Sequence, residues 1–155
     1  MYHAKINNEV ELNYPDSFVE MNEEGLTRHF GTPENRWGAY DEAGHIILSV
    51  SWAKSGFLKT LGDADLYLSQ AEARLRRRLL NYQRVLSYDT KLGKKKAYAV
   101  RFEYRVNDSV NIHVGDLVVF KHKKMYYSIY YITRKKNAAS SRPAFQEILQ
   151  SVTLS

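Results

Sequence analysis

The feature that most constrains the fold is an apolar and aromatic run between Val110 and Thr133, interrupted by a basic turn. In its second half, Met125–Ile132, the side chains on both sides of an extended strand are apolar, with Ser128 as the exception. Successive side chains of a β-strand leave opposite faces, so a strand with one face in water alternates apolar with polar residues. We therefore predict a strand covered on both faces, in a sheet that forms the middle layer of the domain.

The tyrosines of this run fit two roles. Exposed rings would form a platform for a protein surface or for stacked bases. Buried rings would be core residues whose hydroxyl groups reach the margins of the sheet. Because both faces of the strand are apolar, we favour the core role for Tyr126, Tyr127, Tyr130 and Tyr131.

The remaining sequence predicts the other strands and three helices. Apolar patterns of period two predict strands at 9–12, 37–40, 45–52, 86–88 and 98–106. Capping residues and apolar stripes predict helices at 23–30 after Asn22, at 63–82 with Asp63 as its cap, and after Ser140 or Ser141 with Pro143 in the first turn. Near Gly115 and Asp116 the apolar phase slips, which indicates a β-bulge. The resulting fold class is α+β, a three-layer α/β/α sandwich with a central, mainly antiparallel sheet of about six to seven strands.

Length and composition favour one globular domain. The chain has 155 residues and no repeat or Pro/Gly/Ser linker, so we predict a single domain, 1–155. No run approaches the roughly 18 apolar residues of a membrane span, and no apolar secretory segment follows Met1. The expected location is the cytoplasm, or a secreted or lipid-anchored one if a signal segment has been removed.

Patterns typical of catalysis or of metal binding are weak. Cysteine is absent, which excludes thiolate ligands and cysteine nucleophiles. The motif Gly-x-Ser-x-Gly does not occur, and the run that starts at Gly93 has one glycine and opens a strand, unlike a phosphate-binding loop. His113 and Asp116 could meet across the expected bulge, but a metal site needs three or four ligands. We predict no enzyme activity, no metal site and no cofactor, and we interpret His113 as a solvated histidine.

The long helix expected at 63–82 carries two apolar stripes. The core-facing stripe consists of Leu68, Ala71, Leu75, Leu79 and Tyr82. Leu66, Ala73 and Leu80 recur every seven residues, about 140° away around the helix. With Arg77, they could meet a protein partner or a second copy of the chain, or a neighbouring loop could cover them, and both readings stay open.

The net charge of +6 comes largely from clustered lysines and arginines. The clusters are Arg74 with Arg76–Arg78, Lys94–Lys96, Lys121 with Lys123 and Lys124, and Lys135 with Lys136. In an antiparallel meander, Lys94, Lys95 and Lys96 could share a sheet end with Lys135 and Lys136, where they would attract phosphates or acidic side chains. The alternative, which we favour, is a set of solubility charges that also protect the sheet edges. Arg76 can in addition pair with Glu72, four residues earlier.

The order of elements and several short motifs resemble the PsbP-like superfamily. The matching segments are Tyr14–Phe18, Gly93 with Phe102 and Tyr104, Asp116–Phe120, Tyr126–Tyr131, and Phe145 with Ile148, Leu149, Ser151 and Val152. The resemblance implies an α/β/α sandwich and a role that is not generally catalytic. Members include an extrinsic photosystem II subunit, a Ran-binding import factor, bacterial lipoproteins and chaperones of secreted effectors.

Two functions follow as predictions. The leading one is a non-catalytic protein-binding or scaffolding, chaperone-like module, which uses the Leu66 stripe or the basic sheet end. The alternative is an anion or nucleic-acid binder that uses the lysine clusters, for which affinity would fall steeply with salt.

Overall fold

The computed structural model of the chain describes residues 1–54, 64–106 and 110–155. Within these ranges, seven antiparallel strands form the central sheet in the order β3-β4-β5-β9-β8-β7-β6. Their bounds are β3 Val19–Glu20, β4 Arg36–Asp41, β5 Ile46–Lys54, β6 Leu80–Leu92, β7 Lys95–Arg105, β8 Ile112–His122 and β9 Met125–Arg134. A second sheet has the order β1-β2-β10, from β1 Tyr2–Ile6, β2 Val10–Tyr14 and β10 Thr153–Leu154.

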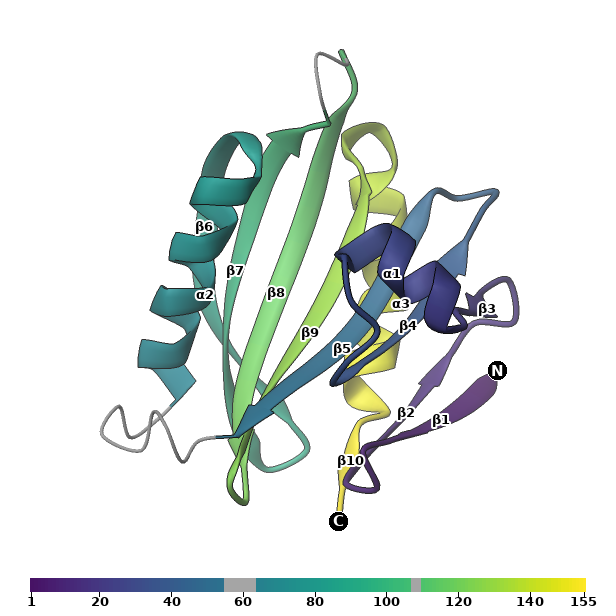
Figure 1. Cartoon of the computed structure of the whole chain (residues 1–155), viewed down its shortest axis with the longest axis vertical. Coiled ribbons are helices and arrows are strands. Elements are labelled where there is room, and N and C mark those ends of the chain that lie inside the picture. The colour runs from purple at the N-terminus through teal and green to yellow at the C-terminus, as the bar shows by residue number, and fades with distance from the viewer. Residues whose placement is uncertain (55–63, 107–109) are drawn as a thin grey trace.

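The central sheet is the middle of three layers (Figure 1). Helices α1 (Glu23–Phe30) and α2 (Ala64–Arg78) lie on one face, and α3 (Lys135–Gln150) lies on the other with the small sheet. Each face has its own hydrophobic cluster, one around α2 and the other around α3 and the small sheet. The predicted α+β sandwich with a central antiparallel sheet is confirmed. Strands β1 and β10 of the small sheet and β3 of the central sheet were not predicted. No helix in the described ranges is long and apolar enough to cross a membrane.

Strand β9 is covered on both faces, as its sequence predicts. Tyr127 packs in the cluster beside α3, and Tyr126 packs in the cluster beside α2, where its ring stacks on Tyr67 at 4.7 Å. Of the four tyrosines of β9, Tyr126, Tyr127 and Tyr131 are buried, and Tyr130 is half-buried. Fully burying a large apolar side chain contributes about 1.5–3 kcal/mol, so this strand is a main source of stability. The core role of these tyrosines is confirmed.

The β-bulge expected at Gly115 and Asp116 is wrong. The pairing of β8 with β7 and β9 is continuous there, and the register shifts of the sheet lie in the edge strand β6 instead. The change of apolar phase has a different cause. Gly115 leaves room for the ring of Phe102, because an added Cβ would lie 2.8 Å from Phe102 Cε2 and closer still to Cζ. Asp116 is a buried polar residue on the opposite face.

The first helix forms as expected, whereas the second ends earlier than expected. The side chain of Asn22 accepts a hydrogen bond from the Gly25 N–H at 2.8 Å and caps α1. Helix α2 ends at Arg78 rather than at residue 82, and Asn81 adopts φ 55° as the chain reverses into β6. Left-handed conformations of this kind suit asparagine and are incompatible with a continuing helix. Asp63, the expected cap, lies outside the described residues.

The last helix begins earlier than expected. It starts at Lys135, directly after β9, and the Arg134 side chain forms no capping hydrogen bond. Ser140 and Ser141 are not caps, because their hydroxyls donate to the carbonyls of Asn137 and Ala138 inside the helix. Pro143 is likewise inside α3 rather than in its first turn. The expected buried stripe forms with Phe145, Ile148 and Leu149, and Val152 is buried just beyond the end of the helix.

Candidate functional site

Two neighbouring hairpins bring lysines together at one end of the central sheet. The β6–β7 hairpin turns at Gly93, with φ 65°, and the β8–β9 hairpin turns at Lys123, with φ 56°. Because β7 and β8 pair in register, with Tyr98 opposite Val119, both turns lie at the same end (Figure 1). We call this surface the basic sheet end, and it consists of Lys94, Lys95, Lys96, Lys121, His122, Lys123 and Lys124.

The basic sheet end has an open groove and few opposing charges. The groove, about 550 Å³ in volume, runs between the β6–β7 turn and strand β10, and lysines 94–96 and His122 line it. Lys123 lies 3.7 Å from a carboxylate oxygen of Glu9. Lys94 and Lys124 are exposed and form no ion pair within the described residues. The surface can therefore accept carboxylates or phosphates from a partner.

The predicted grouping of Lys94–Lys96 with Lys135 and Lys136 is wrong. Strand β9 ends next to the start of β8, where Arg134 pairs with His113, and this is the sheet end opposite Lys94. An eleven-residue strand such as β8 spans about 35 Å at 3.2–3.4 Å per residue. Lys135 forms an ion pair with Glu103 at 3.3 Å. Anion binding by Lys135 and Lys136 stays a prediction, but it cannot share one site with Lys94–Lys96.

The predicted partner face on α2 is shorter than expected. Leu66 is 46% exposed, Ala73 is half-buried and Arg77 is exposed on this helix. Leu80 is 44% exposed but is the first residue of β6, so it does not continue the helical stripe. Because α2 ends at Arg78, the spacing of seven residues does not place Leu80 on the same face as Leu66 and Ala73. A partner-binding role for the remaining face stays a prediction.

The inner side of α2 carries a polar cluster around Glu72 that the sequence showed only in part. The expected contact with Arg76 is present at 3.3 Å, and Arg84 from β6 donates to the same carboxylate through Nε at 2.8 Å. The Tyr82 hydroxyl donates to it as well, at 2.7 Å. These groups, Arg84 first among them, lower the pKa of Glu72 against the opposing effect of burial. The cluster fastens α2 to the edge strand, and its single carboxylate is shared by two arginines.

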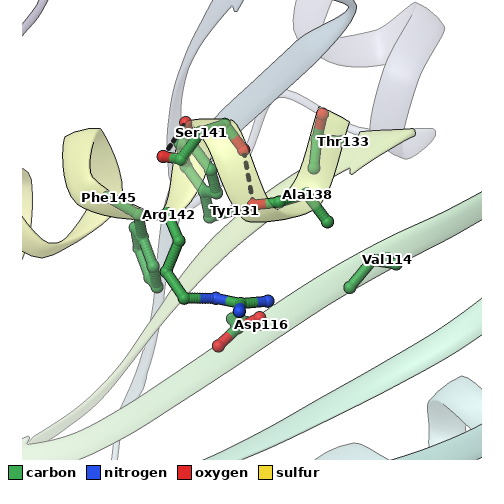
Figure 2. Close-up of a pocket in the computed structure, with 8 residues that line it drawn as sticks. All are labelled: Val114, Asp116, Tyr131, Thr133, Ala138, Ser141, Arg142 and Phe145. Atoms are coloured by element: carbon green, nitrogen blue, oxygen red, sulfur yellow. Dashed lines mark hydrogen bonds between the residues drawn. The ribbon is translucent and has the colours of Figure 1, made fainter. Parts of the chain in front are cut away.

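A second buried polar cluster lies under α3 and is centred on Asp116 (Figure 2). Arg101 from β7 donates to Asp116 at 3.0 Å, and the Tyr88 hydroxyl from β6 donates at 2.5 Å. Figure 2 shows the guanidinium of Arg142 extending from α3 toward the same carboxylate. The cavity beside it holds about 10 Å³, which is room for roughly one water molecule. The cluster therefore clamps strands β6, β7 and β8 and offers no space for a substrate.

His113 and Asp116 do not meet. With no bulge between them, residues three apart in a strand point to opposite faces. His113 is half-buried rather than solvated, with its ring stacked on Tyr104 at 5.4 Å between centroids, and burial lowers its pKa. Among the described residues, no group of three or more His, Cys, Asp or Glu is arranged to hold a metal ion.

The comparisons with known proteins bear on the fold. No protein-family model matches the sequence, and no curated protein matches it. The solution structure of cyanobacterial PsbP (CyanoP) from Synechocystis does match, with a TM-score of 0.70 at 13% identity, over 99% of this chain and 92% of that one. The chain has the PsbP-like fold.

Other PsbP-like structures extend this comparison. LpqN, involved in cell envelope biogenesis of Mycobacterium tuberculosis, matches with a TM-score of 0.66 at 16% identity, over 94% of this chain and 83% of that one. A protein of unknown function, PA94 from Pseudomonas aeruginosa, described as a putative regulator, matches with a TM-score of 0.59 at 10% identity, over 97% and 94%. At such identities the likeness concerns the PsbP-like architecture and not the residues of a site.

Proposed function

We propose that this PsbP-like domain is a non-catalytic binding module that holds an acidic segment of a protein partner at the basic sheet end. One observation carries the proposal: two hairpin turns meet at one end of the sheet, where Lys94–Lys96 and His122 line an open groove. The second turn adds Lys121, Lys123 and Lys124 to the same sheet end. The descriptions of two structural neighbours, cyanobacterial PsbP (CyanoP) and LpqN, which is involved in cell envelope biogenesis, are compatible with such a role. That residues 1–155 form a single domain and that the protein is cytoplasmic also remain predictions.

The chemistry of the basic sheet end favours carboxylates over single-stranded nucleic acid. Proteins that bind single strands combine positive charge with exposed aromatic rings on which bases stack. Here the nearby rings are covered, because Tyr126 is fully buried and Tyr98 is half-buried, with Lys96 Nζ 5.0 Å from its centroid. The lysines offer charge without a stacking surface. Nucleic-acid binding is therefore the alternative outcome of the test.

Charge reversal at the two ends of the sheet tests the proposal with a matched control. The double variant Lys94→Glu/Lys96→Glu changes the basic sheet end, and Lys135→Glu/Lys136→Glu makes the same change of charge at the opposite end. Each exposed ion pair contributes about 0.2–1 kcal/mol. Because a reversal also adds a repulsion of similar size at each of the two positions, we expect the first variant to weaken binding about tenfold. The probe is a fluorescent twelve-residue poly-glutamate peptide, followed by anisotropy at low and physiological salt.

The outcomes separate the candidate functions. A loss confined to the Lys94/Lys96 variant supports the proposal. Equal loss in both variants, or no binding of the peptide, refutes it. Single- and double-stranded twelve-nucleotide oligonucleotides are titrated in parallel, and tighter binding of either, with a steep salt dependence, establishes the nucleic-acid alternative.

The exposed face of α2 is tested separately. Leu66→Asp removes the largest apolar side chain of that face without touching the basic sheet end. If the face joins two copies of the chain, Leu66→Asp shifts a concentration-dependent dimer to monomer in sedimentation velocity, and Leu80→Asp, which lies on β6, has a smaller effect. An unchanged sedimentation profile removes the helix face as a self-association surface.

A further inference from the structure

A pocket between the two helices on one face of the sheet combines apolar walls with arginine side chains. It lies where the C-terminal ends of α1 and α2 approach the sheet, and its volume is about 220 Å³. Phe102, Tyr104, Tyr130 and Ile132 supply much of its apolar lining from the sheet. Arg36 from β4 and Arg78 from α2 also line it. We call it the arginine pocket.

The charge of Arg36 lacks a counter-ion in the part of the chain that the structure describes. Its guanidinium lies 4.3 Å from the ring centroid of Phe30, and Nη1 donates to the hydroxyl of Ser49 at 3.2 Å. Its Nε is buried and has no hydrogen-bond acceptor. Neither Arg36 nor Arg78 forms an ion pair with a described carboxylate, which contrasts with the matched charges of Arg84 and Arg101.

This arrangement costs free energy in the empty pocket. Arg36 is half-buried, and its contacts with the Phe30 ring and the Ser49 hydroxyl replace only part of its lost hydration, because neither partner carries a negative charge. Burial lowers the pKa of Arg36, and the charge of Arg78 lowers it further. At the mouth His29 adds no fixed positive charge at neutral pH, since burial and then Arg28 lower its pKa. An anionic group placed between the two arginines would remove this cost.

We propose that the arginine pocket binds a small organic carboxylate with an apolar body. The carboxylate accepts hydrogen bonds from the Arg36 Nε–H and from the guanidinium of Arg78, and the apolar body lies against the aromatic lining. The size fits such a ligand, because an apolar cavity of about 150 Å³ already holds benzene. Arginine is well suited to this task, since its planar fork matches the geometry of a carboxylate.

Calorimetric titration of the full chain with four probes separates the contribution of the ligand's negative charge from that of its apolar body. Phenylacetate has both features, hexanoate replaces the ring by an aliphatic chain, phenylacetamide removes the charge, and inorganic phosphate removes the body. We expect phenylacetate or hexanoate to bind with one-to-one stoichiometry, at least about tenfold more tightly than phenylacetamide and phosphate. Whichever of the two binds better identifies the body as aromatic or aliphatic.

Three variants locate the site. Arg36→Met and Arg78→Gln each reduce carboxylate affinity at least about tenfold. Arg77→Gln is the matched control, because Arg77 is exposed, adjacent in sequence and not part of the pocket lining. Without ligand, Arg36→Met also raises the melting temperature, whereas a purely structural arginine would lower it on removal. Since Arg78 is exposed, its variant is expected to fold even if Arg36→Met does not.

Two results overturn the proposal. In one, phenylacetamide binds as tightly as phenylacetate, or neither carboxylate binds. In the other, Arg77→Gln weakens binding as much as Arg78→Gln does, which would place the interaction on the exposed surface of α2 instead of in the pocket.

Discussion

The close approach of Gly115 and Phe102 makes a sharp prediction about the centre of the sheet. In Gly115→Ala the new Cβ would lie 2.8 Å from Cε2 and 3.0 Å from Cε1 of Phe102, and nearer still to Cζ. Phe102 is fully buried, stacked on Tyr82 at 5.3 Å and tilted against Tyr104 at 5.9 Å, so a shift of its ring away from the new methyl group would disturb both contacts. Overpacking of this kind costs about 1–3 kcal/mol.

Gly115→Ala also has a stabilising effect, which acts through the unfolded chain and offsets part of the steric cost. Replacing glycine by alanine restricts the unfolded chain and stabilises a protein by about 0.4–1 kcal/mol where the native backbone accepts it. The difference leaves a loss of roughly 1–2 kcal/mol for Gly115→Ala, taken from the upper part of the overpacking range because the contact is with a rigid ring. At about 2–4 °C per kcal/mol for a chain of this length, the melting temperature should fall by several degrees.

Urea unfolding of the wild type and variants measures this loss directly. Gly38→Ala is the matched control, since its Cβ would meet Leu26 Cδ2 at 3.0 Å and Met21 Sδ at 3.1 Å, which are the ends of flexible side chains that can shift. Phe102→Leu in the Gly115→Ala background should recover part of the loss, with a coupling free energy of about 1 kcal/mol or more. A loss below 0.5 kcal/mol, or fully additive effects, would refute the steric account of Gly115.

Three further predictions concern polar groups. Asp116→Asn leaves the half-buried Arg101 without its counter-ion, so it should lower the free energy of unfolding by about 3 kcal/mol in urea titrations. A loss of stability as small as that of a typical surface substitution would show that the clamp is not structural. Arg84 lowers the pKa of Glu72 in the folded protein. The stabilising effect of Glu72 is therefore fully present above its pKa in the unfolded chain, about 4.3, and is lost as pH falls through its pKa in the folded protein. The stability difference between wild type and Glu72→Gln should therefore shrink between neutral pH and pH 3, and a constant difference would contradict this. Asn22→Ala should cost about 1 kcal/mol through loss of the α1 cap, measurable as a shift in the urea midpoint, and no shift would contradict the capping role.

The layered architecture was predictable because it rests on local patterns. The unbroken apolar character of Met125–Ile132 required cover on both faces, and the structure supplies it with α2 on one side and α3 with the small sheet on the other. The Asn22 cap and the turn at Gly93 are equally local, since each depends on residues a few positions apart. Strand β1 was missed although it carries a local pattern of period two, in which Tyr2, Ala4 and Ile6 alternate with His3 and Lys5.

Errors arose where a long-range contact decided the outcome. The phase change at Gly115 looked like a bulge, yet its cause is the ring of Phe102 on the neighbouring strand, which no sequence window around Gly115 contains. The buried Asp116 could have been recognised, because a charged residue in a fully covered strand must be paired. Its partner Arg101 could not have been, since that choice depends on the register of β7 with β8.

The same limit applies to the binding surfaces. The lysines were visible in the sequence, but which clusters share an end of the sheet depends on the direction of each strand. The arginine pocket was invisible, because Arg36 looks like an ordinary strand residue until Phe30, Ser49 and Arg78 are placed around it. Only the missing counter-ion, which is a property of the folded chain, singles it out.

The two proposed sites should act independently, and their separation allows a test. From Lys96 in the basic sheet end to Tyr104 in the arginine pocket, strand β7 runs eight residues, or about 26 Å. Two unit charges that far apart in water interact by about 0.2 kcal/mol before screening, and the Debye length of about 8 Å at physiological salt removes most of that. Lys94→Glu/Lys96→Glu should therefore change carboxylate affinity in the arginine pocket by less than about twofold at physiological salt. A larger change in the calorimetric titration would mean that the β7 strand or its neighbours transmit a structural difference between the sites, because the direct electrostatic effect is too small to account for it.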